Sequence, residues 1–207
     1  MSNHLTRVFN KETSVFAAWR QDTRQSIAAS FKIDWNNTRV SKLIKSQDDM
    51  NDVHDFMESN YEFITEIYRE LQMNSLYPFV NKIELAAFCE KSKLIDANLN
   101  MANCDLIFVM ANTATKGGIK AKTGLIRCEF LEYLIRLANF KHRDTKQVDT
   151  FIDAIQIVIN DYIKPNVEPL PWQSFRDEEL WTIEVNDVFD CNLDGISKIQ
   201  SYYSTPT

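Results

Sequence analysis

Six residues near the end of the chain, Asp190-Cys191-Asn192-Leu193-Asp194-Gly195, place oxygen ligands at alternate positions before a glycine. They fit the first half of the pattern D-x-[DN]-x-[DN]-G, in which side-chain oxygens bind a calcium ion. Calcium requires six to eight oxygen ligands, and Asp190, Asn192 and Asp194 would supply the first of them. The chemistry that this segment suggests is therefore weak calcium binding.

The second half of that pattern is missing. Ser201 occupies the position of the bidentate glutamate, and Ser197 occupies the position of the aliphatic residue. Apolar residues also recur through the segment at helical spacing, from Ile183 to Ile199. Two interpretations stay open, a continuous helix, which we expect, and a weak calcium loop.

Residues that could perform catalysis are scarce. His54 precedes Asp55 and lies four residues before Glu58, so a two-ligand metal site is conceivable, although a solvated surface histidine is the expected state. The segment 116–124, KGGIKAKTG, lacks the order GxxxxGK[ST] of a phosphate-binding loop. No serine or cysteine has the local signature of an activated nucleophile. We predict a protein that is not an enzyme and that binds no cofactor, with calcium as the alternative.

The amino-acid composition excludes several further classes of protein. The 207 residues include only four glycines and carry a net charge of −6, which argues against glycine-rich nucleotide sites and against nucleic-acid partners. The four cysteines form no CxxC pair and lie in apolar runs, so we expect buried free thiols in a reducing compartment. The first residues lack the apolar region of a signal peptide, and no apolar run is long enough to cross a bilayer. These features predict a cytoplasmic protein without membrane insertion.

The elements that would position these residues are mostly helices. Apolar residues at steps of three and four, with caps and prolines at the ends, mark each of them. Residues 32–47 are expected to be an extended connection, and 79–80 and 125–126 to be short β-prone pieces. The predicted helices cover residues 12–31, 48–72, 82–97, 101–112, 127–142, 147–163 and 177–203.

Two consecutive stretches repeat one arrangement: a helix, a break, a β-prone pair and a second helix. VNKIELAAF, from Val80, aligns with LIRCEFLEY, from Leu125, so that each has an aliphatic residue and a glutamate four residues later. This resembles the second half of an EF-hand. The resemblance implies that Val80 and Leu125 take loop position 8, in the small β-bridge between paired loops. It also implies that Glu84 and Glu129 take position 12, that of the bidentate calcium ligand.

The other calcium ligands of such a pair are missing. In the first loop, ligand positions fall on Met73 and Tyr77, and the glycine position falls on Pro78. In the second loop, they include Lys120 and Lys122, whose ammonium groups would repel the ion. We therefore expect the two glutamates to be helix-start residues rather than calcium ligands. The two EF-hand-like units would then have lost calcium binding.

A wider resemblance concerns residues 126–138, IRCEFLEYLIRLA, and 175–181, FRDEELW. They are similar to segments of a group of protist proteins of ciliary or flagellar type, in which a degenerate EF-hand pair is followed by extra helices. The resemblance spans roughly residues 35–203. It implies an accessory structural or calcium-regulatory role in an axoneme-like assembly, and hence a cytoplasmic or axonemal location.

Together these observations predict an all-α protein with a degenerate EF-hand-like pair over residues 46–143. A helical arm and connector would precede it at 1–45, and C-terminal helices at 144–207 would pack on it. The predicted function is a calcium-independent protein-interaction module of a ciliary or cytoskeletal assembly, with a calcium sensor as the alternative. Its partner would be a helical peptide or an axonemal or cytoskeletal component. The partner would bind in the groove of an opened pair, or the chain's own helix at 147–163 or 177–203 would fill that groove. Candidate groove residues, for each of which plain core packing is the expected alternative, are Phe63, Ile67, Phe88, Phe108, Met110, Phe130 and Leu134.

Overall fold

The computed structural model describes residues 8–75, 77–112 and 124–204. The chain forms two compact units, one from residues 23–170 and the other from the N-terminal residues up to 22 together with those from 171 onward. Helices dominate both units, so the predicted all-α class is confirmed. Among the described residues, every helix is too short or too polar to cross a lipid bilayer.

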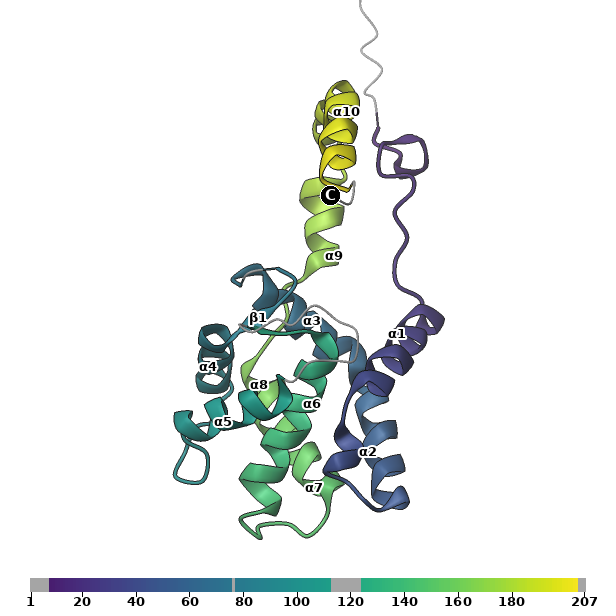
Figure 1. The fold of residues 1–207 in the computed structure, drawn as a ribbon. Helices are drawn as coiled ribbons and strands as arrows, with labels where there is room; N and C mark the ends of the chain where they lie inside the picture. Colours follow the sequence, from purple (N-terminus) through teal and green to yellow (C-terminus); the bar gives the residue numbers. More distant parts are fainter. Residues whose placement is uncertain (1–7, 76, 113–123, 205–207) are drawn as a thin grey trace, which may run out of the picture. The chain divides into compact units, whose positions relative to one another are not determined.

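The larger unit holds most of the helices (Figure 1). Their order includes one short 3-10 helix, η2, and two π-helical segments, η3 and η4, that continue α6 and α7 without a break. The elements are α1 (Arg24–Asn37), η2 (Val40–Lys42), α2 (Gln47–Ser59), α3 (Tyr61–Met73), β1 (Val80–Asn81), α4 (Lys82–Lys91), α5 (Met101–Ala111), β2 (Gly124–Leu125), α6 (Arg127–Ala138), η3 (Asn139–Arg143), α7 (Phe151–Gln156), η4 (Ile157–Ile163) and α8 (Lys164–Asn166).

The first helix begins and ends later than its predicted range of 12–31. Thr23 starts α1 because its hydroxyl accepts the Ser26 N–H at 3.1 Å, while the Ser26 hydroxyl accepts the Thr23 N–H at 2.8 Å. The helix then continues through residues 32–37, which the sequence had predicted as extended. Phe31 is fully buried there, and Trp35 packs on it with ring centroids 5.7 Å apart.

The helix predicted over residues 48–72 is two helices, α2 and α3. Ser46 caps α2, since its hydroxyl accepts the Asp49 N–H at 3.3 Å, and the chain turns at Asn60, whose φ and ψ are −105° and 3°. Asn60 is buried, and its amide donates to the Phe56 carbonyl at 2.8 Å. The corner lets both helices bury an apolar face in one core, which one straight helix of that length could not do.

The two strands form the short antiparallel bridge that joins the repeated stretches. Val80 pairs with Leu125 and Asn81 pairs with Gly124, so the register is the one that the aligned segments predict. Gly124 is required by space: a Cβ there would lie 2.7 Å from the Phe79 Cβ and 2.9 Å from the Val80 carbonyl oxygen. The bridge itself is confirmed, whereas the relationship to EF-hands stays a prediction.

The core of this unit extends beyond the pair predicted at 46–143. The central helix α6 packs against α1, α3, α5 and α7, and α2 packs against α7. The helix predicted at 147–163 forms α7, η4 and α8, and its apolar residues join the same hydrophobic core. The expected boundaries after residues 45 and 143 therefore both lie inside one compact unit.

The smaller unit consists of a 3-10 helix η1 (Lys11–Thr13), α9 (Trp172–Phe175), a π-helical segment η5 (Arg176–Leu180) and α10 (Ile183–Ser204). The helix predicted at 177–203 is interrupted at Trp181, whose φ and ψ are −90° and 63°. Trp181 packs edge-on against Trp19 at 5.1 Å, and the Lys11 ammonium lies 4.6 and 4.7 Å above these two rings. Residues far apart in sequence thus hold this unit together.

Candidate protein-interaction site

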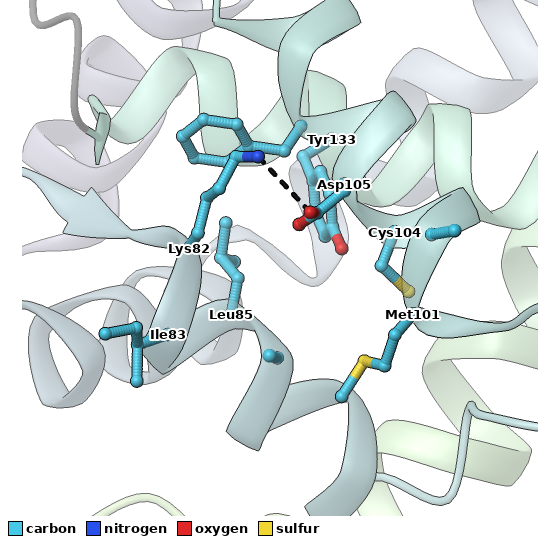
Figure 2. Close-up of a pocket in the computed structure, with 10 residues that line it drawn as sticks. Lys82, Ile83, Leu85, Met101, Cys104, Asp105 and Tyr133 are labelled. Carbon is cyan, nitrogen blue, oxygen red and sulfur yellow. Dashed lines mark ion pairs between the residues drawn. The ribbon is translucent and has the colours of Figure 1, made fainter.

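A hollow of about 350 Å³ opens between α4 and α5, over the side chain of Tyr133 on α6 (Figure 2). Its size lies in the range of about 300–1,000 Å³ that is usual for ligand sites. Most of its wall is apolar. The lining residues are Lys82, Ile83, Leu85, Ala86, Met101, Ala102, Cys104, Asp105, Phe108 and Tyr133.

Asparagine caps fix where the two helices of the hollow begin. The Asn81 side-chain oxygen accepts the N–H groups of Ile83 and Glu84 at 2.8 and 3.0 Å and starts α4 at the end of the β-bridge. Asn100 and Asn103 form a reciprocal pair of hydrogen bonds, both 3.0 Å, that starts α5. Because each cap satisfies N–H groups that a helix start leaves free, the starting residue of both helices is set locally.

Helix α5 is apolar on both of its sides. One side is buried in the core, through Ile107 and Ala111 among others. The opposite side exposes Leu106, Val109 and Met110, with 53%, 56% and 45% of their surfaces accessible. An exposed apolar patch beside an apolar hollow is characteristic of an interaction surface.

The polar groups at the hollow neutralise one another. Lys82 on α4 and Asp105 on α5 form an ion pair at 3.3 Å across its mouth, as Figure 2 shows. The Lys82 ammonium also lies 5.4 Å from the centre of the Phe108 ring. The lining therefore has no net charge, which suits an uncharged apolar ligand surface better than an anion or a cation.

A small thiol cluster lies beside the hollow. The Cys89 sulfur on α4 is 3.4 Å from the Tyr133 hydroxyl, and Cys104 lines the hollow together with Tyr133. The contact with Cys104 and complete burial raise the pKa of Cys89, whereas hydrogen bonds from Cys89 and Tyr133 lower the pKa of Cys104. Cys104 is thus the thiol of this pair that is favoured as thiolate.

The residues predicted to line a partner groove are divided by the structure. Phe108 lines the hollow and Met110 lies exposed on α5. Phe88 and Phe130 pack edge to face at 5.9 Å in the core, so a partner cannot reach them in this conformation. Phe63 is partly buried against the same core, and the remaining two, Ile67 and Leu134, are buried within it.

The surface residues Leu106 and Val109, and the hollow residues Ile83 and Met101, did not enter the sequence-based prediction. The signal that could have found them is the composition of α5, in which residues 106–111 read LIFVMA. A helix that is apolar all round needs partners on every side. Among the described residues of this unit, partners pack on only one side of α5.

The three proposed calcium ligands lie in the uninterrupted helix α10 and are exposed. Asp190 and Asp194 are one helical turn apart on one face, whereas Asn192 lies about 200° around the helix axis from Asp190. Its amide donates to the Val188 carbonyl at 2.7 Å. The structure therefore brings two of these side chains together and directs the third away, as expected for the continuous helix.

Of the EF-hand-type glutamates, Glu129 acts at a helix start, as predicted. Its carboxylate accepts the Ile126 N–H at 3.0 Å, and burial raises its pKa. Glu84 occupies the corresponding place on α4, where its own N–H is bound by Asn81. Lys120 and Lys122 of the second predicted loop lie outside the described residues, as do residues 116–123 of the glycine- and lysine-rich segment.

Packing against aromatic rings explains the position of the His54 side chain, which the sequence offered as a potential metal ligand. The His54 ring contacts Phe31 and Trp35 edge-on at 5.1 and 5.2 Å, and its Nδ1 lies 2.9 Å from an Asp55 carboxylate oxygen. Ligand atoms of His54, Asp55 and Glu58 lie within 4.8 Å of one another, but both acids are exposed to solvent. The ring therefore has a structural role on α2.

Several buried ionisable groups bind each other and hold the fold. Glu132 accepts the Arg39 backbone N–H at 2.7 Å and the Arg136 guanidinium at 2.7 Å. Asp34 binds the Tyr61 hydroxyl and the Arg127 guanidinium, and this ion pair raises the pKa of Arg127. These pairs tie α1 and η2 to α6.

A scan against protein-family models, a search of curated proteins and a search of solved structures each found no match.

Proposed function

We propose that this chain is a non-catalytic protein-interaction module that binds an amphipathic helix of another protein at the hollow between α4 and α5. The observation that carries the proposal is the exposed apolar side of α5, formed by Leu106, Val109 and Met110, next to that hollow. A partner helix could insert one large apolar side chain into the hollow and lay its apolar face along α5.

The charges at the hollow restrict which partner helix could bind there. Lys82 and Asp105 already neutralise each other at the mouth, so the part of the partner that enters has to be uncharged. A charged group placed there would lose its water without gaining a partner. We therefore expect an aliphatic or aromatic anchor in the partner, with charged residues confined to its outer face.

Binding is proposed to be independent of calcium. Support comes from the helical conformation of Asp190, Asn192 and Asp194 and from the helix-start role of Glu129. Calcium titration calorimetry tests this directly. A binding isotherm that the substitutions Asp190→Ala and Asp194→Ala abolish would instead favour the calcium-sensor alternative. A ciliary or cytoskeletal setting is part of the proposal and is supported by the sequence resemblance alone.

The interaction is tested by selecting binders from a displayed library of helical peptides. Val109→Glu and Leu106→Glu place a charge on the proposed surface without altering the core, and each should weaken the selected peptides by about tenfold or more. Ile33→Glu is the matched control, because Ile33 is an exposed apolar residue of another helix, α1. Peptides that bind all four proteins equally, or no enriched peptide at all, would contradict the proposal.

A further inference from the structure

Two cysteines from neighbouring helices meet beside the hollow. Cys89 on α4 is fully buried, and Cys104 on α5 lines the hollow with about 5% of its surface accessible. The Cys89 sulfur is 3.4 Å from the Tyr133 hydroxyl, Cys104 lines the hollow beside Tyr133, and the two thiols shift each other's pKa. Figure 2 shows the Cys104 sulfur and the Tyr133 side chain bordering the same space.

The three groups have different access to solvent. A small molecule in the hollow reaches Cys104 first, whereas Cys89 lies behind it in the core. Hydrogen bonds donated to the Cys104 sulfur favour its thiolate, the reactive form of cysteine. The arrangement thus places a reactive thiol in front and a second thiol within reach behind it, as in redox-sensitive cysteine pairs.

We propose that Cys104 and Cys89 form a peroxide-reactive dithiol that closes to a disulfide between α4 and α5. The Cys104 thiolate attacks the O–O bond of a hydroperoxide, so that an S–O bond forms, the O–O bond breaks and the leaving oxygen departs as an alcohol, or as water from hydrogen peroxide. The Cys89 sulfur then attacks the Cys104 sulfur. The S–S bond forms, the S–O bond breaks, and the hydroxyl leaves as water with the Cys89 proton. Overall, two thiols are oxidised and one peroxide is reduced.

The other two cysteines lack this arrangement and serve as controls. Burial raises the pKa of Cys128 to about 12, and its side chain does not line the hollow. Cys191 is exposed on α10, in the smaller unit. The reaction is therefore expected to be specific to one pair.

The test uses the full chain with Cys191→Ser, which prevents cross-linking between molecules. The folded protein is treated with hydrogen peroxide, the remaining thiols are alkylated, and the intact mass and the peptide map are measured. We expect the loss of two hydrogen atoms, a Cys89–Cys104 cross-linked peptide, and full recovery on reduction. In Cys89→Ser, Cys104 should accumulate as a sulfenic acid that a dimedone probe captures. Cys128→Ser should leave the cross-link unchanged.

The expected cross-link is measured in a chain that keeps both cysteines, so it does not depend on whether either substitution folds. A folded chain that retains both thiols after peroxide treatment would overturn the proposal. A cross-link that involves Cys128 would also overturn it, as would dimedone capture at Cys89 in preference to Cys104. The same treatment in urea shows what unfolded chains form, and a cross-link that appears only there counts against the folded-state pair.

Discussion

Lys141 is fully buried, which makes it the most informative single position for testing the forces in the larger unit. Its ammonium donates to the Leu94 carbonyl at 2.9 Å, forms an ion pair with Asp96, and lies 4.9 Å from the centre of the Tyr162 ring. The lysine thereby ties the linker after α4 to η3, the segment that continues α6. Replacing it by methionine keeps a long flexible side chain and removes only the charge and the donors.

The size of the effect follows from these contacts. Breaking a buried ion pair costs about 3–5 kcal/mol, and a carbonyl left without a donor costs about 1–3 kcal/mol. Asp96 is partly exposed and can regain water, and methionine returns some apolar packing, so the terms do not add fully. We expect Lys141→Met to lower the free energy of unfolding by about 2–4 kcal/mol at neutral pH.

The effect should also depend on pH. Burial raises the pKa of Asp96, but hydrogen bonds from Lys141 and from the Leu99 and Asn98 N–H groups outweigh it, so the net pKa is lowered. A carboxyl group with a lowered pKa stabilises the fold above its ordinary pKa of about 3.9, and this contribution is lost as the pH falls towards the folded value. The difference between the wild type and Lys141→Met should therefore be constant above about pH 5 and shrink below about pH 4.

Urea unfolding followed by circular dichroism, repeated across this pH range, measures the loss of unfolding free energy and its dependence on pH. Lys32→Met is the control, because Lys32 is exposed on α1 and its replacement should change stability by less than about 0.5 kcal/mol. A gain in stability for Lys141→Met would refute the reasoning. It would mean that desolvation of the ammonium costs more free energy than its contacts in the folded protein contribute.

Three further predictions concern two glycines and the thiols. Gly124→Ala should destabilise the fold by about 1–3 kcal/mol in chemical denaturation, because the added methyl group would collide with the backbone of Val80 across the bridge. Gly195→Ala, whose Cβ would meet nothing within 4 Å in the exposed helix α10, should instead stabilise it by about 0.5–1 kcal/mol. In folded protein at mildly alkaline pH, iodoacetamide should modify Cys191 and leave Cys128 intact, since Cys128 has a pKa of about 12; equal labelling of both would contradict its burial.

The sequence predicted those parts of the fold that depend on local signals. Caps and apolar spacing located α5 and α6 to within a few residues, and the aligned segments predicted the pairing of Val80 with Leu125. The turn at Asn60 escaped prediction, because apolar spacing continues through it at helical period and no glycine or proline marks it. The chain turns there because α2 and α3 each pack against a different set of helices.

The candidate site was predicted only in part, for a related reason. Phe108 and Phe130 are both large apolar residues on helices, and sequence spacing cannot tell which one will face a hollow and which will be covered by a neighbouring helix. Cys191 lies between Asp190 and Asn192 on a helix that leaves it exposed, so the expectation of four buried thiols was wrong at that position. Burial is decided by the packing of distant elements, which periodicity does not encode.

The π-helical segments η3, η4 and η5 have a consequence for the comparison of related sequences. A π-turn closes on the fifth residue rather than the fourth, so each segment accommodates about one residue more than an α-helix of the same span. A relative lacking one residue within 139–143, 157–163 or 176–180 could close the same stretch as a plain α-helix. In an alignment of related sequences, single-residue gaps at these three places would then reflect a change between π-helix and α-helix rather than a shorter loop.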